Sequence, residues 1–277
     1  MNRAIYDSNG YYDSDGKASR LASGLNPLLN FLDRMKAQSF IKKLSIPKGN
    51  VLDVGAGDGK FLYYMKQAGM IPFGTSASQI SCDAAKKNYG IDLDYSTELS
   101  GKLLKQKYEA ISYWHVFEHL EDPEAHVKQW PLMLADGGKV MIEVPNIDSI
   151  GASLSFDAWL GSDLKHHINH MSRKQIQELV QRYNLKVDAV EYFSLKFSYV
   201  FLWSALLGFI FGKSYNFDTV FALIKEPFTC LKRKPLFTIN GLAAVFYLLP
   251  VILLLIPVGL VSKRGEVLKM YISPNDK

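Results

Sequence analysis

The sequence predicts an α/β protein with a doubly wound parallel sheet, followed by a hydrophobic helical region. Three observations lead to this prediction. Strand-like and helix-like segments alternate between residues 50 and 193, a glycine-rich turn joins the first strand to the first helix, and charged residues become sparse from residue 197. Repeated β-α units of this length favour parallel strands that are connected by helices.

The individual elements follow from hydrophobic spacing and from capping residues. Residues 1–20 are polar and predict a loose arm, whereas apolar residues between 26 and 43 recur at helical spacing. Ser78 and Pro123 are favoured at helix starts, and the segment 172–175 has the pattern of a capping box. We expect strands at 50–54, 71–74, 91–95, 109–114, 139–144, 185–193 and 266–273, helices at 58–68, 78–87, 97–105, 123–134 and 172–183, and a turn at 136–138.

The composition is that of a folded chain with a modest positive charge. Of 277 residues, 48% are hydrophobic and 21% are charged, so the chain can bury a core and global disorder is not indicated. The net charge of +5 fits a membrane surface or an anionic ligand and does not indicate nucleic acid. Cys82 and Cys230 are far apart and lack a metal-ligand spacing, which is typical of a reducing compartment. The polar residues 1–17 predict no cleavable secretion signal.

The most informative stretch is residues 51–59, which read Val-Leu-Asp-Val-Gly-Ala-Gly-Asp-Gly. Gly55, Gly57 and Gly59 permit positive φ angles and the close approach of a ligand to the backbone. A strand, a glycine turn and a helix start together make a nucleotide-type site at the carboxyl edge of a parallel sheet. The G-x-G-x-G spacing differs from the G-x-G-x-x-G of dinucleotide binders and argues against an NAD-dependent oxidoreductase. The alternative is an ordinary tight turn.

A second motif follows the fourth expected strand. Residues 114–123 read Trp-His-Val-Phe-Glu-His-Leu-Glu-Asp-Pro, and residues 134–146 contain a Gly-Gly turn and end in Pro-Asn. With the glycine loop, these motifs resemble class I S-adenosylmethionine (SAM) dependent methyltransferases, most closely the group that contains the ubiquinone-pathway O-methyltransferases and uncharacterised bacterial relatives. The resemblance covers residues 50–193 and 265–273.

The resemblance implies a Rossmann-like, mostly parallel sheet with an antiparallel last strand. It divides the chain into four parts. These are an N-terminal arm and cap helix (1–45), a SAM-binding core (46–194), a hydrophobic helical insertion (195–264) and the last strand of the core sheet (265–277).

The resemblance also implies SAM as the cofactor and places its binding residues. In the family an acid at the end of the second strand holds the ribose hydroxyls, but Ser76 stands at that position and lacks the charge. This departure favours one alternative, a non-catalytic methyltransferase-like scaffold protein at a membrane. Tyr11 and Tyr12 are candidates to fold over the cofactor. The residues implied in cofactor binding are Asp53, Gly55, Ala56, Gly57, Gly59, Ser76 and Trp114.

The histidines offer a base for the reaction. All six lie between residues 115 and 170, mostly after the carboxyl ends of expected strands. Methyl transfer is an in-line displacement that depends mainly on positioning, and a hydroxyl acceptor must also lose its proton to a base. We favour His119 or His167 as this base, with His115 as a further candidate. His126 is expected on an outer helix without a catalytic role.

Two alternatives for the same cluster remain open. His115, Glu118 and His119 could ligate a divalent metal ion, with His166 or His170 completing the site. This metal is possible but not favoured. In the other alternative, Glu118 and His119 only hold the loop over the cofactor.

Two uncharged segments, 197–212 and 241–261, flank a basic stretch. The last strand belongs to a sheet that is expected in the cytosol, so the chain must return to the cytosol after the two uncharged segments. These segments therefore cannot cross the membrane only once. Two crossings would export the basic stretch against the positive-inside rule, and the first segment is shorter than the roughly 20 residues of a span. We therefore expect a monotopic hairpin or in-plane helices in the cytoplasmic leaflet. Two crossings, a buried helical subdomain and an oligomer interface are the alternatives.

Together these features predict a SAM-dependent methyltransferase at the cytoplasmic face of a membrane, most simply a bacterial-type inner membrane. The expected reaction is O-methylation of a lipid, a lipid-linked molecule or another apolar small molecule. The expected partners are this acceptor and membrane lipids contacted through residues 197–261, with no nucleic acid.

Overall fold

The computed structural model describes residues 20–46, 48–195, 197–225 and 227–275. The expected arm, with Tyr11 and Tyr12, lies outside the described residues. The chain forms two compact units. The first contains the residues up to Ile142, Leu179–Ala189 and those from Tyr271 on, and the second contains Glu143–Glu178 and Val190–Met270.

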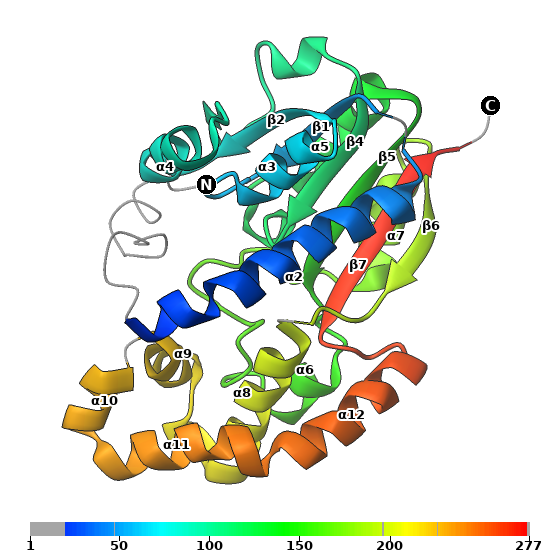
Figure 1. The fold of residues 1–277 in the computed structure, drawn as a ribbon. Helices are drawn as coiled ribbons and strands as arrows, with labels where there is room; N and C mark the ends of the chain where they lie inside the picture. The colour runs from blue at the N-terminus through cyan, green and yellow to red at the C-terminus, as the bar shows by residue number, and fades with distance from the viewer. Residues whose placement is uncertain (1–19, 47, 196, 226, 276–277) are drawn as a thin grey trace. The chain divides into compact units, whose positions relative to one another are not determined.

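Within the described residues, one sheet of seven strands has the order β3-β2-β1-β4-β5-β7-β6 (Figure 1). β1 pairs in parallel with β2 and β4, and β2 pairs in parallel with β3. The last strand, β7, is antiparallel and lies between β5 and β6, so the predicted sheet class is confirmed. The strands are β1 (Asn50–Val54), β2 (Ile71–Ser76), β3 (Asp94–Tyr95), β4 (Tyr108–Trp114), β5 (Leu134–Pro145), β6 (Leu185–Glu191) and β7 (Val267–Pro274).

The helices alternate with the strands, and their caps act as the sequence predicts. The Ser78 hydroxyl accepts from the Ser81 amide, which starts α4. Ser172 and Gln175 exchange side-chain-to-backbone hydrogen bonds of 2.8 and 3.3 Å, a complete capping box before α7. The helices are α2 (Arg20–Leu44), α3 (Lys60–Gln67), α4 (Gln79–Tyr89), α5 (Pro123–Met133), α6 (Ile150–Leu154), α7 (Arg173–Gln181), α8 (Phe197–Phe211), α9 (Phe217–Lys225), α10 (Pro227–Arg233), α11 (Pro235–Tyr247) and α12 (Leu249–Val261), with 3₁₀ turns η1 (Leu103–Lys105), η2 (Phe117–His119) and η3 (Gly212–Ser214).

Three local predictions were wrong in extent. The expected strand 91–95 shortens to β3. The expected helix 97–105 shortens to η1, because the Ser96 side chain bonds the amide and the carbonyl of Glu98 in a local turn. The expected turn 136–138 lies inside β5. Gly138 approaches the backbone so closely that an added Cβ would lie 2.6 Å from the Tyr108 carbonyl, a contact that only glycine permits within a strand.

The first unit has an apolar core between the sheet and α2. Phe40 and Leu44 of α2 are buried in one cluster with Val51 of β1 and Met65 of α3. Lys60 Nζ, at the start of α3, lies 2.5 Å from Asp33 Oδ2 of α2. α2 covers the residues expected to form a cap helix, and this ion pair connects it to the helix that follows the glycine loop.

The second unit is built around α8. This helix was expected to face lipid, but its residues from Phe201 to Gly208 are buried, and it packs against α6, α11 and α12. A helix that is apolar on all sides suits a protein core as well as a bilayer, and here the protein core surrounds it. The alternative of a buried helical subdomain therefore describes α8.

No single helix among the described residues is both long and apolar enough to span a membrane. α11 and α12 reach this length and hydropathy only as a pair that bends by 58°.

Candidate active site

The loop after β1 is held in a conformation that needs glycine. Gly55, Gly57 and Gly59 adopt φ angles of 72°, 55° and 75°. An added Cβ on Gly55 would lie 2.5 Å from the Val116 side chain. The Ala56 amide donates to the Thr75 carbonyl at 2.7 Å, so the loop is fixed to the end of β2 as well.

This loop borders an open hollow in the first unit, with about 410 Å³ of empty space including the part open to solvent. The hollow opens where β1, β2, β3 and β4 end, which is the place where doubly wound sheets bind ligands. Its lining residues are Val54, Gly55, Thr75, Ser76, Ala77, Ser96, Thr97, His115, Val116, His119 and Leu120.

Asp53 lies buried on β1, two residues before the glycine loop. Burial raises the pKa of this carboxyl to about 7, while a hydrogen bond from Ser112 and the nearby charge of Lys36 oppose the rise. The Ser112 hydroxyl lies 2.6 Å from Asp53 Oδ1. The carboxyl of Asp53 is therefore poised to change its charge near neutral pH.

Lys36 of α2 was not singled out from the sequence. Its Nζ lies 3.6 Å from the centroid of a Trp114 ring and 5.4 Å from that of Phe61, a cation–π arrangement. Trp114, a predicted cofactor residue, is thus fixed at the end of β4 between α2 and α3. No local pattern marks Lys36, because tertiary packing alone brings it to this site.

Ser76 occupies the end of β2, where the family has an acid. Its hydroxyl accepts from the Ser78 amide at 3.3 Å, which leaves the hydroxyl hydrogen to donate. Ser96 and Thr97 line the same part of the hollow. This side of the site therefore offers neutral hydroxyl groups to a ligand.

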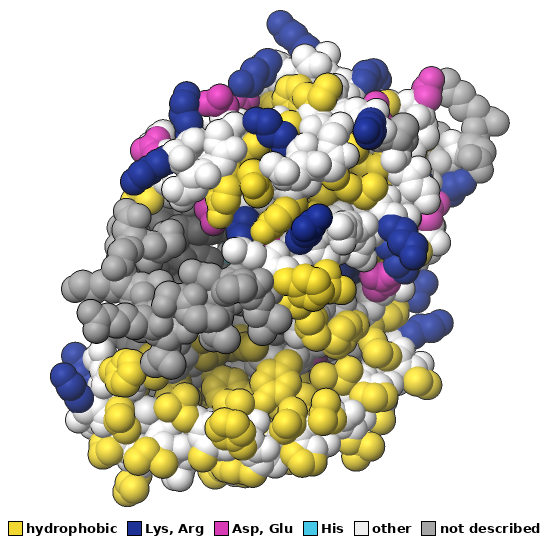
Figure 2. Space-filling view, in the orientation of Figure 1, with side chains coloured by type: hydrophobic (Ala, Val, Ile, Leu, Met, Phe, Trp, Pro, Cys, Tyr) yellow, Lys and Arg dark blue, Asp and Glu magenta, His cyan; other side chains and the backbone are white. Residues whose placement is uncertain are grey.

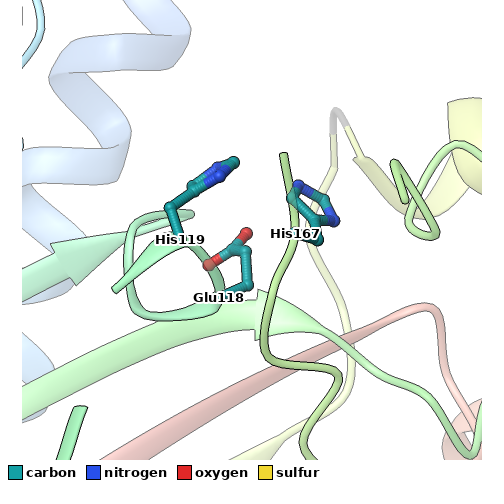
Figure 3. A group of neighbouring side chains, drawn as sticks. All are labelled: Glu118, His119 and His167. Atoms are coloured by element: carbon teal, nitrogen blue, oxygen red, sulfur yellow. The ribbon is translucent and has the colours of Figure 1, made fainter. Parts of the chain in front are cut away.

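The η2 turn after β4 carries two more predicted residues. Glu118 and His119 extend from this turn with buried side chains (Figure 3). His115, just before the turn, has a φ of 53° and places Nδ1 3.3 Å from Glu118 Oε1. A positive φ at a residue other than glycine costs energy and is common at functional sites. His115 and His119 both line the hollow, so one of the two favoured bases lies there.

The other favoured base, His167, belongs to the second unit and is also drawn in Figure 3. Its Nδ1 lies 2.9 Å from the Gly161 carbonyl, which fixes the ring within its loop. His166 Nδ1 lies 2.8 Å from Asp163 Oδ1, and His170 Nε2 lies 2.5 Å from the Ser162 carbonyl. The expected metal ligands are thus divided between the two units, and a metal site stays a prediction.

His126 is a core residue of α5. Its Nδ1 lies 3.1 Å from the Tyr113 hydroxyl, which also accepts from Trp130 Nε1 at 3.0 Å. Burial lowers the pKa of His126 to about 4, so the ring is neutral near pH 7. A neutral, hydrogen-bonded histidine in this place stabilises α5 against β4.

Comparison with known proteins identifies the class. Residues 29–190 match the family described as a methyltransferase domain, and the chain belongs to this family. With the sheet order and the glycine loop, this makes it a class I, SAM-dependent methyltransferase, and SAM is the cofactor of the class, as predicted.

Individual relatives are more distant. The ubiquinone biosynthesis O-methyltransferase of Coxiella burnetii is 24% identical over 123 residues, which cover 43% of this chain and 53% of the relative. The chain therefore matches only about half the length of these curated relatives.

Two solved structures show the same fold. A putative sarcosine dimethylglycine methyltransferase from Galdieria sulphuraria is 15% identical with a TM-score of 0.52, covering 88% of this chain and 86% of that chain. The magnesium protoporphyrin IX methyltransferase of Synechocystis PCC 6803, solved with bound S-adenosylhomocysteine (SAH), is 15% identical with a TM-score of 0.50. The match covers 70% of this chain and 93% of that chain.

Proposed function

We propose that this protein transfers the methyl group of SAM to an oxygen atom of a lipid, a lipid-linked molecule or another apolar acceptor at the cytoplasmic face of a membrane. The observation that carries the proposal is the hollow beside Gly55–Gly59, where a bare backbone, hydroxyl groups and two histidines meet. The family match supports the methyl donor.

The chain's own residues hold the cofactor. The backbone of the glycine loop lets the amino-acid part of SAM approach closely, and Asp53 lies directly behind this loop. In this proposal the hydroxyl of Ser76 donates a hydrogen bond to the ribose. SAM supplies an electrophilic methyl group on a positively charged sulfur, and the protein contributes positioning and the exclusion of water.

His119 acts as the base in this proposal. The acceptor hydroxyl oxygen forms a bond to the methyl carbon while the carbon–sulfur bond breaks and its electron pair stays on sulfur. The hydroxyl proton passes to the imidazole of His119. His119 is buried and lines the hollow, which suits this role, while His115 and His167 remain the alternative bases.

Two observations support an apolar acceptor at a membrane. The Coxiella relatives are named for an O-methyl transfer in ubiquinone biosynthesis. The second unit carries large exposed apolar side chains on α11 and α12. An acceptor dissolved in a bilayer could reach such an enzyme by lateral diffusion.

Cofactor binding is the first test. We expect calorimetric titration of the detergent-solubilised protein with SAH to show binding, and Gly57→Arg to abolish it. Gly101→Arg is a matched control, because Gly101 has a φ of 57° and open space around it. The acceptor is then sought by incubating the enzyme with methyl-labelled SAM and a lipid extract, followed by extraction of labelled lipids. Transfer only to water-soluble molecules, independent of lipid, would refute the apolar acceptor.

Ser76 alone favours the second candidate function, a non-catalytic scaffold at the membrane. A folded wild-type protein that binds neither SAH nor SAM would support the scaffold and overturn the enzyme.

A further inference from the structure

The outer face of α11 and α12 is apolar along most of its length, with Asn240 as an exposed polar residue. Leu236, Phe246 and Val261 are 76%, 79% and 86% exposed. Figure 2 shows hydrophobic side chains gathered over these two helices. The other large apolar residues exposed on the pair are Ile239, Leu242, Tyr247, Leu249, Val251, Leu253, Leu254, Val258 and Leu260.

The inner face of the same pair is packed against the second unit. Ala244, Leu248 and Ile252 are buried in the cluster that contains α8. Gly241 permits close packing, since an added Cβ would lie 2.5 Å from the Leu223 side chain of α9. The helices are therefore apolar on both faces, unlike the amphipathic surface helices of globular proteins. Because the inner face of α11 and α12 is packed against the rest of the second unit, the apolar outer face is held in place and suits a nonpolar partner.

Positive charge borders this surface at both ends. Lys232, Arg233 and Lys234 precede α11, and Lys263 and Arg264 follow α12, all of them exposed. No acidic residue occurs between 227 and 265 in the sequence. An apolar surface bordered only by cations is complementary to a bilayer with anionic headgroups.

The C-terminal end of α12 is tied to the second unit. Arg264 donates from Nη2 to the Ser153 hydroxyl at 2.6 Å and from Nε to the Asp148 carbonyl at 3.1 Å. Two residues later, the Glu266 carboxylate accepts from Trp159 Nε1 at 2.8 Å. These bonds hold the end of the helix pair beside α6.

The dimensions of the helices favour an orientation parallel to the bilayer. α11 and α12 have 13 residues each, whereas roughly 20 are needed to cross the hydrocarbon core, and the pair that together has this length bends by 58°. In a spanning arrangement the two basic clusters would lie on opposite sides of the membrane. In a parallel arrangement both clusters reach the headgroups of one leaflet.

We propose that the outer face of α11 and α12 inserts into one leaflet of an anionic phospholipid bilayer, with both helices parallel to the membrane plane and with Lys232, Arg233, Lys234 and Lys263 on lipid phosphates. This inference rests on the membrane location in the proposed function and adds the two helices that form the surface, the face they insert and the lipid charge.

Vesicle flotation of the full-length protein tests the surface. We expect binding to phosphatidylcholine vesicles that contain phosphatidylglycerol to exceed binding to pure phosphatidylcholine at least about tenfold. Phe246→Glu/Leu254→Glu should remove most of the binding, and Arg233→Glu/Lys234→Glu should remove the preference for anionic lipid. The matched controls are Leu132→Glu, at an exposed apolar residue of α5, and Lys42→Glu/Lys43→Glu, at exposed lysines of α2.

A labelling experiment tests the orientation. Single-cysteine variants Lys234→Cys and Lys263→Cys, each with Cys82→Ala and Cys230→Ala, are bound to preformed vesicles and treated outside with a membrane-impermeant maleimide. Label at both positions supports the parallel arrangement, and protection of one position would overturn it in favour of a span.

SAH binding, measured on every variant, separates this inference from the proposed function. Two results would overturn the bilayer surface while SAH binding persists. One is that Phe246→Glu/Leu254→Glu binds vesicles as well as the wild type does. The other is that the wild type binds no vesicles and forms a stable dimer in analytical ultracentrifugation. Loss of SAH binding in the wild type would instead overturn the proposed enzyme.

Discussion

The hydroxyl of Ser112 on β4 donates a 2.6 Å hydrogen bond to the buried carboxyl of Asp53 on β1. Because burial raises the pKa of Asp53 to about 7 in the folded protein, this carboxyl gains its charge only near neutral pH. An ionised Asp53 would attract the ammonium group of SAM. We therefore expect SAH affinity to rise as the pH increases through about 7, and calorimetry across this range measures it.

Substitution at the same pair tests the assignment. Ser112→Ala removes a hydrogen bond that favours the ionised carboxyl, so the pH midpoint of SAH binding should move upward. Asp53→Asn should remove the pH dependence. In the folded protein the pKa of Asp53, about 7, lies above its ordinary value of 3.8. The folded state therefore binds the proton more tightly than the unfolded state, and ionisation of Asp53 lowers the free energy of unfolding as the pH rises from the lower pKa to the higher one. This loss is no more than about 4 kcal/mol. An unchanged midpoint in Ser112→Ala would contradict the role of the pair.

Gly55→Ala should weaken both the fold and the cofactor site. The alanine would have to adopt a φ of 72°, and its Cβ would lie 2.5 Å from the Val116 side chain. We therefore expect a loss of about 2–3 kcal/mol in the free energy of unfolding. Gly90→Ala is the matched control, with a φ of 63° and open space, and should lose only about 1 kcal/mol. Chemical denaturation measures both. The double variant Gly55→Ala/Val116→Ala should recover part of the loss, and its failure to do so would refute the steric explanation.

Ser76→Asp should strengthen SAM binding. A carboxylate at the end of β2 would replace a neutral hydrogen bond to the ribose with a charge-assisted one, worth about tenfold in affinity. Ser76→Ala should weaken binding a few-fold. Ser81→Asp on α4, also at a buried serine, controls for the burial of a new charge. If Ser76→Asp and Ser76→Ala bind SAH like the wild type, the ribose does not contact this position.

His119→Ala should lower kcat by about 10²–10⁴-fold while SAH still binds, because a general base acts on the acceptor and not on the cofactor. His115→Ala and His167→Ala, assayed in parallel, compare the three candidate bases. His126→Ala is expected to reduce stability instead, since it removes a core hydrogen bond to Tyr113. Full activity of His119→Ala would assign the proton transfer elsewhere.

Glu266→Ala should destabilise the second unit. Its carboxylate accepts from the Gly151 amide at 2.9 Å and from Trp159 Nε1 at 2.8 Å, and both buried donors would lose their acceptor. We expect a loss of about 2–4 kcal/mol, measured by denaturation with tryptophan fluorescence. Glu98→Ala, at an exposed glutamate, should change little. A wild-type stability for Glu266→Ala would mean that water replaces the carboxylate.

The sequence predicted the sheet class and the glycine loop because their signals are local. Gly55, Gly57 and Gly59 mark the loop by spacing alone, and Ser172 with Gln175 marks a helix start. Lys36 and Ser112 escaped notice because their roles arise from packing against residues distant in the chain. The burial of α8 was only one of the alternatives, since hydropathy does not distinguish a helix inside protein from one inside lipid.

The position of β7 in the sheet has a consequence for biosynthesis. β7 follows α12 in the sequence but lies between β5 and β6. While the ribosome is still producing the helices from α8 to α12, β5 and β6 have no strand between them. The sheet can therefore be completed only after the apolar helices have emerged, and until then unpaired strand edges and nonpolar surface are open to aggregation. Early capture of these helices by a bilayer or a chaperone would protect the nascent chain during that interval.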